Sequence, residues 1–272
     1  MRVALRSYEE LPEPVRRAVA GQVGEGSAVA DMANATSSGF AALLTAPGGG
    51  SVFVKGLPED HERTAELNVE SAVAPFLPDF APRLLWRVAA GGWTILGFEG
   101  ITSTSPWADF YADDSPHLDS VATVLQELST TSAPPEARLK PAWERWEEYC
   151  DPVDEPLLTG DMLVHGDPAA VNFLPGTDRT WLIDWAWAAR GPGWVDAVLW
   201  GQRLVLDGEQ TPEQAARWCR RIPAFAEAPR EGVVVLAEAD ARSWEAWHEY
   251  GTPGLERHVK AARAWADYWQ TP

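Results

Sequence analysis

Lysine is scarce in this chain of 272 residues. Only Lys55, Lys140 and Lys260 occur, although the chain holds 22 basic residues in all. Acidic residues outnumber basic ones by 40 to 22, which gives a formal net charge of -18 at pH 7. Such a surface repels phosphate backbones, so nucleic acid is excluded as the main partner. The charge favours a cationic partner or substrate, or it simply keeps the protein in solution.

Cysteine pairs and long apolar runs are also lacking. Cys150 and Cys219 are the two cysteines; they form no Cys-x-x-Cys motif and are too few for a disulfide framework. No apolar stretch approaches the roughly 20 residues that span a bilayer, so no membrane contact is expected. The first residues contain no apolar signal core. We therefore expect a cytoplasmic protein in a reducing compartment. Its composition, 46% hydrophobic and 23% charged, is that of a globular chain.

The first hundred residues alternate between helical and strand-like patterns. Apolar spacing predicts helices over 8–20 and 60–77, and two strand pairs lie over 40–55 and 83–98. Each strand pair turns at a glycine cluster, the first in Ala46–Gly50. The order is therefore helix, then β-β-α-β-β.

The remainder of the chain is mostly helical. One helix begins near Ser115-Pro116, another begins at Thr211 with the spacing of a capping box, and the last covers about 253–270. A single β-rich island lies within 171–184. We predict an α+β fold with a small β-rich lobe over 1–98, a larger helical lobe over 99–272, and a hinge near 97–101.

The stretch that carries chemistry is LVHGDPAAVNFLPGTDRTWLID, residues 163–184. Asp167 follows a short apolar strand, Asn172 lies five residues later, and Asp184 ends the β-rich island. A loop and a hairpin of this kind should bring the three side chains to one edge. Carboxylate and amide oxygens form a hard site that suits Mg²⁺ bound to phosphates, and a second carboxylate can orient a hydroxyl or accept its proton.

His165-Gly166-Asp167, Asn172 and Ile183-Asp184-Trp185 together resemble the signature of the aminoglycoside phosphotransferase and choline-kinase-like group. The resemblance implies a bilobal protein-kinase-like fold whose small N-terminal lobe holds an antiparallel sheet. It also implies a phosphotransferase with an alcohol group as acceptor, which uses Mg²⁺ and either ATP or GTP as phosphoryl donor.

The same resemblance assigns roles to residues of the motif. Asp167 is the catalytic residue that orients or deprotonates the acceptor hydroxyl, and Asn172 and Asp184 hold the metal. Asp196, at the start of a later helix, is expected to support the His-Gly-Asp loop through its backbone. His165 is expected to be a structural hydrogen-bonding residue in that loop.

In the small lobe the resemblance calls for a lysine that neutralises the α- and β-phosphates. Lys55 ends the strand Val52–Val54, and with so few lysines in the chain its position is informative. A glutamate on the next helix should pair with it. Glu66 and Glu70 are one turn apart on the same face, and Glu70 fits better because Val73 and Leu77 continue its spacing.

The remaining nucleotide contacts are expected at a loop and at the hinge. The phosphate-covering loop, 34–39, contains one glycine only, so backbone amides and the hydroxyls of Ser37 and Ser38 would bind phosphate. The hinge would contact the nucleobase through the backbone of Phe98 and Glu99. The side chain of Glu99 is expected to be structural.

The acceptor is expected to be a small molecule that contacts the helical lobe, and no oligomeric state follows from the sequence. Acidic side chains that could line its pocket and bind a cationic aminoglycoside, or merely face water, are Asp109, Asp113, Asp114, Asp119, Glu227, Glu231, Glu238, Asp240, Glu245 and Glu249. Aromatic candidates are Trp107, Phe110, Tyr111, Trp185, Trp187, Trp244 and Trp247.

An antibiotic-resistance kinase is one interpretation. The alternatives are a metabolic kinase for choline, a sugar, homoserine or a biosynthetic intermediate, and a non-catalytic kinase-like binding protein.

Overall fold

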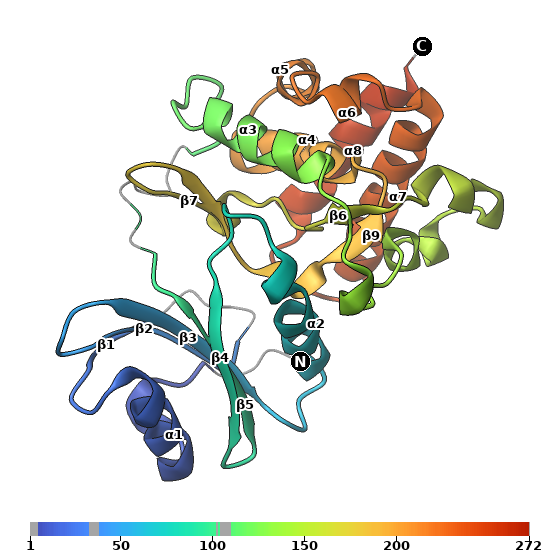
Figure 1. Ribbon diagram of the computed structural model, residues 1–272. Coiled ribbons are helices and arrows are strands. Elements are labelled where there is room, and N and C mark those ends of the chain that lie inside the picture. Colours follow the sequence, from blue (N-terminus) through green and yellow to red (C-terminus); the bar gives the residue numbers. More distant parts are fainter. Residues whose placement is uncertain (1–4, 33–37, 102, 104–109, 272) are drawn as a thin grey trace. The chain divides into compact units, whose positions relative to one another are not determined.

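Residues 5–32, 38–101, 103 and 110–271 are described by the computed structural model (Figure 1). The chain divides into two units. The first combines Met1–Ser103 with the short segment Asp184–Ala186, and the second combines Thr104–Ile183 with Trp187–Pro272. Asp184–Ala186 thus groups with a part of the chain that is distant in sequence.

An antiparallel sheet in the order β1-β2-β3-β5-β4 is the framework of the first unit. Gly49 and Gly50 turn the first hairpin at φ +85° and +86°, in the left-handed region that glycine adopts without strain. The strands are β1 (Ala28–Asp31), β2 (Phe40–Thr45), β3 (Ser51–Pro58), β4 (Leu84–Ala90) and β5 (Trp93–Glu99). The two predicted strand pairs are confirmed, and β1 is an additional edge strand.

Each face of this sheet is covered by one helix. Helix α1 (Glu13–Val23), preceded by the single turn η1 (Tyr8–Glu10), packs through Val15 and Val19 on a cluster that includes Val54 and Ile95. Helix α2 (Thr64–Val73), continued by η2 (Ala74–Phe76), packs through Leu67 on Leu57, Leu96 and Phe98. Because side chains alternate along a strand, Lys55 shares the α2 face with Leu57.

The second unit is built around helix α4, against which α3, α5, α6, α7 and α8 pack (Figure 1). The helices are α3 (Leu118–Ser129), α4 (Val195–Asp207), α5 (Pro212–Cys219), α6 (Pro223–Ala226), α7 (Arg230–Glu249) and α8 (Glu256–Gln270). Short helical turns are η3 (Pro135–Ala137), η4 (Ala142–Arg145), η5 (Glu147–Tyr149), η6 (Pro152–Leu158) and η7 (Ala170–Asn172). The turn η8 (Trp185–Trp187) spans residues of both units.

Two small antiparallel ribbons lie beside these helices. Strand β6 (Met162–Val164) pairs with β9 (Ala189–Gly191), and β7 (Phe173–Pro175) pairs with β8 (Thr180–Leu182). The second ribbon is the predicted β-rich island. The predicted capping box is also confirmed, because the backbone N–H of Gln214 donates to Thr211 Oγ1 and that of Thr211 donates to Gln214 Oε1. No helix of the described residues is long and apolar enough to cross a bilayer.

Candidate functional site

Lys55 is buried between two carboxylates of the first unit. Its Nζ atom lies 2.7 Å from Glu70 Oε2 and 2.7 Å from Asp184 Oδ1. The Lys55 side chain is 7% exposed and that of Glu70 is 3% exposed, whereas Asp184 is partly open to solvent at 28%. A strand residue that faces α2 and a helix residue in the row Leu67, Glu70, Val73 are therefore brought together by their two periodicities.

The opposite charges of Lys55, Glu70 and Asp184 offset the unfavourable effect of burial on the charged forms of these side chains. Burial by itself lowers the pKa of Lys55, but the carboxylates of Asp184 and Glu70 outweigh it, so the pKa is raised above 10.5. For Glu70 burial is the largest influence and raises the pKa above 4.5, while the Lys55 charge opposes it. The lysine is thus held as a cation away from bulk water.

Glu66, the alternative partner of the lysine, pairs instead with Arg63. The Arg63 guanidinium donates to both carboxylate oxygens of Glu66, with Nε–Oε1 at 2.8 Å and Nη2–Oε2 at 2.7 Å. Glu66 lies one turn before Glu70 on α2, so the two glutamates hold different cations. The structure therefore distinguishes the candidates that spacing left open.

Glu70 also holds the segment that follows Asp184. Its Oε1 atom accepts a hydrogen bond from the backbone N–H of Trp185 at 3.3 Å. Asp184 itself has φ +65°, a left-handed conformation that is uncommon for a residue other than glycine. An uncommon backbone at a charged residue is typical of functional sites, where surrounding contacts maintain it.

In the second unit, the carboxylate of Asp196 accepts hydrogen bonds from the backbone of the His-Gly-Asp loop. Asp196 Oδ2 accepts from the N–H of His165 and Oδ1 accepts from that of Gly166, both at 2.8 Å. Burial raises the pKa of Asp196, and the His165 ring and the two amide bonds oppose that rise. Gly166 has φ +84°, and a Cβ there would meet the Trp187 carbonyl oxygen at 2.8 Å. The predicted support of the loop by Asp196 is confirmed.

His165 serves as a structural link, as predicted. Its ring is fully buried. The N–H of Asp167 donates to Nδ1 at 3.2 Å, and Nε2 lies 2.9 Å from the carbonyl oxygen of Ile183. A ring nitrogen that faces a carbonyl oxygen donates to it, so Nε2 is the donor of this hydrogen bond. The ring ties the loop to the residue that precedes Asp184.

Asn172 returns to Asp167 across the loop. Its Nδ2 donates to the backbone oxygen of Asp167 at 2.8 Å and to Oδ2 of the same residue at 3.2 Å. This leaves the amide oxygen Oδ1 to serve as a ligand. Because the Asn172 carbonyl also accepts from the N–H of Ile183 at 2.9 Å, Asn172 is fixed next to the residue that precedes Asp184 in the chain.

These donors fit a hard cation. The Asn172 side chain offers an amide oxygen and the Asp184 side chain offers a carboxylate, and each is a type of oxygen ligand that suits Mg²⁺. Among the described residues no group of three or more His, Cys, Asp or Glu could hold a metal alone.

Arg203, which the sequence analysis did not single out, contacts the side chain of Asp167. Its Nη2 atom donates to Asp167 Oδ1 at 2.8 Å, and the two side chains are 13% and 27% exposed. Arg203 lies on α4, seven residues after Asp196 and hence on the same helix face. That spacing is the signal from which this contact could have been proposed.

The predicted nucleotide contacts fall in different surroundings. Ser37 and most of the loop 34–39 lie outside the described residues. Ser38 is buried, and the ring of Phe98 is buried with Lys55 Nζ 5.9 Å from its centre. Glu99 donates its N–H to the Arg83 carbonyl at 2.9 Å, and its carboxylate lies 3.5 Å from Arg83 Nε. Arg83 thus gives the Glu99 side chain the structural partner that was expected.

Many of the acidic acceptor candidates already have protein partners. Asp119 pairs with Arg221, and Glu238 and Glu245 pair with Arg263. Asp113 accepts from Gln214 and Trp218, while the buried Asp240 accepts from the indole N–H groups of Trp146 and Trp244. Asp113 and Asp119 are exposed despite these partners, and the other exposed candidates are Asp114, Glu227, Glu231 and Glu249. Asp109 and Trp107 lie outside the described residues.

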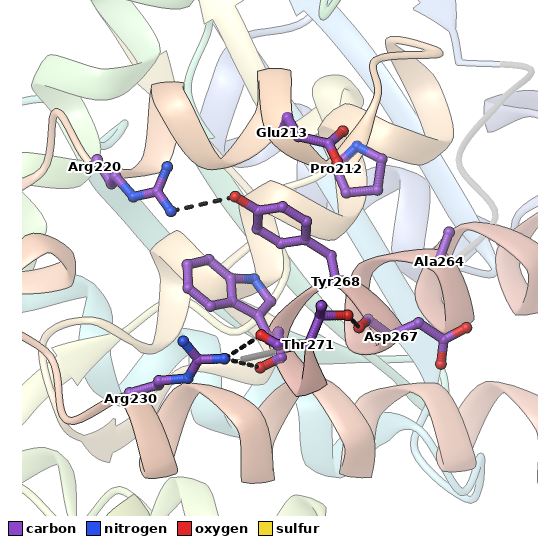
Figure 2. A pocket seen from close by; sticks show the side chains of 9 residues that line it. Pro212, Glu213, Arg220, Arg230, Ala264, Asp267, Tyr268 and Thr271 are labelled. Carbon is purple, nitrogen blue, oxygen red and sulfur yellow. Dashed lines mark hydrogen bonds between the residues drawn. The ribbon is translucent and has the colours of Figure 1, made fainter.

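A surface hollow of about 550 Å³ lies between α5 and α8 (Figure 2). Arg220 donates to the Tyr268 hydroxyl at 3.3 Å, and Arg230 donates to the carbonyl oxygens of Trp269 and Thr271. Carbonyls at a helix C-terminus lack partners within the helix, so Arg230 completes the end of α8. The hollow is lined by no residue of the His-Gly-Asp loop. The polar contacts of Arg230 within it are explained by their role at the C-terminal end of α8.

Comparison with known proteins identifies the fold. No protein-family model and no curated protein matches the sequence. Among solved structures, choline kinase LicA from Streptococcus pneumoniae has a TM-score of 0.61 at 15% identity, with 93% of this chain and 98% of that chain covered. A choline/ethanolamine kinase family protein from Mesorhizobium loti has a TM-score of 0.60 at 16% identity, with 97% and 92% covered.

A thermostable mutant of an aminoglycoside phosphotransferase, solved in a ternary complex with ADP and hygromycin B, is similar as well. Its TM-score is 0.57 at 14% identity, with 92% of this chain and 98% of that chain covered. At these identities the likeness shows a shared fold. The predicted bilobal, kinase-like α+β fold is confirmed, and so is the resemblance to the fold of this group.

Proposed function

We propose that this chain is an Mg²⁺-dependent small-molecule kinase that transfers the γ-phosphoryl group of ATP or GTP to a hydroxyl group. The observation that carries the proposal is the buried Lys55, ion-paired with both Glu70 and Asp184. Phosphoryl transfer depends on positioning and on neutralising the charge of the phosphates, which a fixed, fully charged lysine supplies. The shared fold with choline kinases and an aminoglycoside phosphotransferase supports the same function.

Each residue then has one task. Lys55, tethered by Glu70, would bind the α- and β-phosphates, and Asn172 Oδ1 and the Asp184 carboxylate would hold Mg²⁺. The metal, when bound, neutralises phosphate charge. Asp167 orients the acceptor hydroxyl and takes its proton as the new oxygen–phosphorus bond forms, the bond between the γ-phosphorus and the β–γ bridging oxygen breaks, and the nucleoside diphosphate leaves. Ser37, Ser38 and the backbone of Phe98 and Glu99 contact the nucleotide.

The acceptor we propose is aminoglycoside-like. Its support is the acidic composition and the fold shared with the hygromycin B complex. A metabolic kinase for choline, a sugar, homoserine or a biosynthetic intermediate is the second candidate. It is favoured by the engagement of Asp119, Glu238 and Glu245 with arginines, which leaves less acidic surface for a polycation.

The test is a coupled assay of ADP or GDP release with Mg²⁺, run against aminoglycosides, choline, ethanolamine, sugars and homoserine. We expect one class to stimulate turnover and to gain the mass of a phosphoryl group. Asp167→Asn should lower transfer at least about 100-fold and keep nucleotide affinity. Asp178→Asn is the matched control. Asp178 lies at an exposed hairpin position and, among the described contacts, pairs only with its neighbour Arg179. A protein that binds no nucleotide with Mg²⁺ refutes the proposal.

A further inference from the structure

The carboxylate of Asp167 is held by donors at both of its oxygens. Arg203 Nη2 lies 2.8 Å from Oδ1, and Asn172 Nδ2 lies 3.2 Å from Oδ2. The loop between Asp167 and Asn172 reads Pro-Ala-Ala-Val and contains no cation. The positive charge at this carboxylate is therefore supplied by helix α4.

One face of α4 holds three consecutive residues of the loop. Asp196, in its first turn, accepts from the backbone N–H groups of His165 and Gly166. Arg203, two turns later, donates to the side chain of Asp167. Because a helix is rigid over two turns, the spacing of these contacts fixes the side chain of Asp167 relative to its own backbone.

Arg203 is itself fixed by helix α7. Its guanidinium carbon lies 5.6 Å from the centre of the Trp244 ring, which favours a cation on that face. Burial lowers the pKa of Arg203, but the carboxylates of Asp167, Asp207 and Asp240 outweigh it, so the pKa is raised. Asp240 is oriented in turn by the indole N–H groups of Trp146 and Trp244, at 3.2 and 3.1 Å.

A second arginine reaches the same loop. Arg145 donates to the carbonyl oxygen of Gly166, and its guanidinium lies between the rings of Trp146 and Trp187, at 4.6 and 4.3 Å from their centres. Arg145 thus holds the backbone of the loop, whereas Arg203 contacts the carboxylate itself. The contact of Arg145 is therefore structural, whereas the contact of Arg203 affects the carboxylate that would meet the acceptor hydroxyl.

We propose that Arg203 is a positioning residue that fixes the Asp167 carboxylate in the orientation needed to receive the acceptor hydroxyl. A carboxylate offers about four lone-pair sites, so two donors still leave room for a hydroxyl. The inference rests on the proposed function, because it requires Asp167 to be the group that meets the acceptor. It adds a charged partner that the His-Gly-Asp motif does not contain.

The test is a double-mutant cycle. Arg203→Gln is made in the wild type and in Asp167→Asn, and turnover is followed as hydrolysis of Mg·ATP and Mg·GTP, so that no acceptor need be known. If Arg203 acts through Asp167, kcat falls about 10- to 100-fold in the wild type and less than about twofold in Asp167→Asn. KM and nucleotide affinity by calorimetry should stay within about twofold.

Two variants complete the design. Arg203→Lys retains the charge without the planar fork, and we expect it to recover part of kcat. Arg221→Gln removes an exposed ion pair with Asp119 in the same unit and should leave kcat unchanged. If Arg203→Gln does not fold, Arg203→Lys carries the same cycle. Equal losses in both Asp167 backgrounds, or an unchanged kcat, overturn the role of Arg203 alone, whereas an inactive wild type that binds no nucleotide overturns the proposed function and this role with it.

Discussion

A lysine that contacts two carboxylates out of water is stable only while all three partners are present. A buried ion pair stabilises a protein little more than apolar residues of similar size in its place would. Removal of only one partner is strongly destabilising, because it leaves an uncompensated buried charge. Lys55 is in this position, with Glu70 almost fully buried on one side and Asp184 on the other. Its substitution should therefore affect both stability and nucleotide binding.

We predict that Lys55→Met lowers the free energy of unfolding by about 3–5 kcal/mol, because Glu70 loses its counter-charge. Mg·nucleotide affinity should fall as well. Urea denaturation and calorimetry measure the two effects. Lys140→Met is the control, since the Lys140 side chain is 80% exposed and, among the described contacts, pairs only with Glu144 four residues later. Equal stability of the two variants would show that the buried pair contributes nothing.

The stability that Lys55 contributes should depend on pH. Because its folded-state pKa is raised above the ordinary 10.5, the contribution is complete below pH 10.5 and is lost as pH rises through the raised value. The difference in unfolding free energy between wild type and Lys55→Met should thus decrease at alkaline pH above 10.5. Chemical denaturation at a series of pH values measures it, and a difference that grows in this range contradicts the assignment.

Among individual residues, the sequence predicts those site residues that belong to a motif or to a rare residue type. Lys55 stands out because lysine is scarce, and Glu70 because of its spacing along a helix. Arg203 is not predicted, since arginine is common in the chain and the motif contains no position for it. The protein partners of Asp119 and Glu238 are likewise invisible in the sequence, because they come from other helices.

Helix α4 joins the loop of Asp167 to the centre of the second unit. Its N-terminal turn supplies Asp196 and its third turn supplies Arg203, while its other faces pack against five helices. A helix so enclosed has little freedom to shift, and groups on it are therefore precise anchors. The bonds from Asp196 and Arg203 hold the loop at His165, Gly166 and Asp167.

We predict that Asp196→Asn lowers the free energy of unfolding by about 2 kcal/mol or more and also lowers kcat. The substitution replaces a charged acceptor of two backbone N–H groups by an amide that cannot accept at both positions. Glu213→Gln is the matched control, because Glu213 is also an acidic residue in the first turn of a helix but is exposed. If both variants behave alike, the loop does not depend on Asp196.

Elements with a regular apolar period are those that the sequence predicts. Helices α1, α2, α3 and α8 follow such a period, whereas strands β2 to β5 are predicted as pairs of strand-like runs around glycine turns. Strand β1 is not predicted, because its four residues are all exposed and it lies at the sheet edge without alternation. The short turns between Pro135 and Leu158 are too brief for any period to repeat.

At the scale of the molecule, the proposed function requires that the protein bind a nucleotide and Mg²⁺. The described residues contain no cluster of three acidic, His or Cys ligands that could retain a metal. We predict that EDTA alone leaves Tm unchanged, whereas Mg·ADP at about 100 times its Kd raises Tm by several degrees. Differential scanning calorimetry measures both. A fall of Tm in EDTA would reveal a resident metal, and Lys55→Met should show a smaller rise with Mg·ADP.

The overall fold follows from one short motif more than from any other feature of the sequence. His165-Gly166-Asp167 with Asn172 and Asp184 indicates the kinase-like fold that the structural comparison confirms. The grouping of Asp184–Ala186 with the first unit has no sequence signal, because contacts such as the Lys55–Asp184 ion pair and the Trp185–Glu70 hydrogen bond join residues far apart in the chain. The acceptor is not predicted either, since its contacts would come from several separate elements.

The buried carboxylate of Asp240 has a spectroscopic consequence. Two indole N–H groups, from Trp146 and Trp244, donate to its two oxygens, and the ring of Trp146 also faces the Arg145 guanidinium. An excited indole shifts electron density toward its six-membered ring, so a carboxylate and a cation at fixed positions displace its emission. The emission wavelengths of Trp146 and Trp244 therefore depend on the charges of Asp240 and of the arginines that face their rings, and their signal adds to that of the other tryptophans among the 15 of the chain.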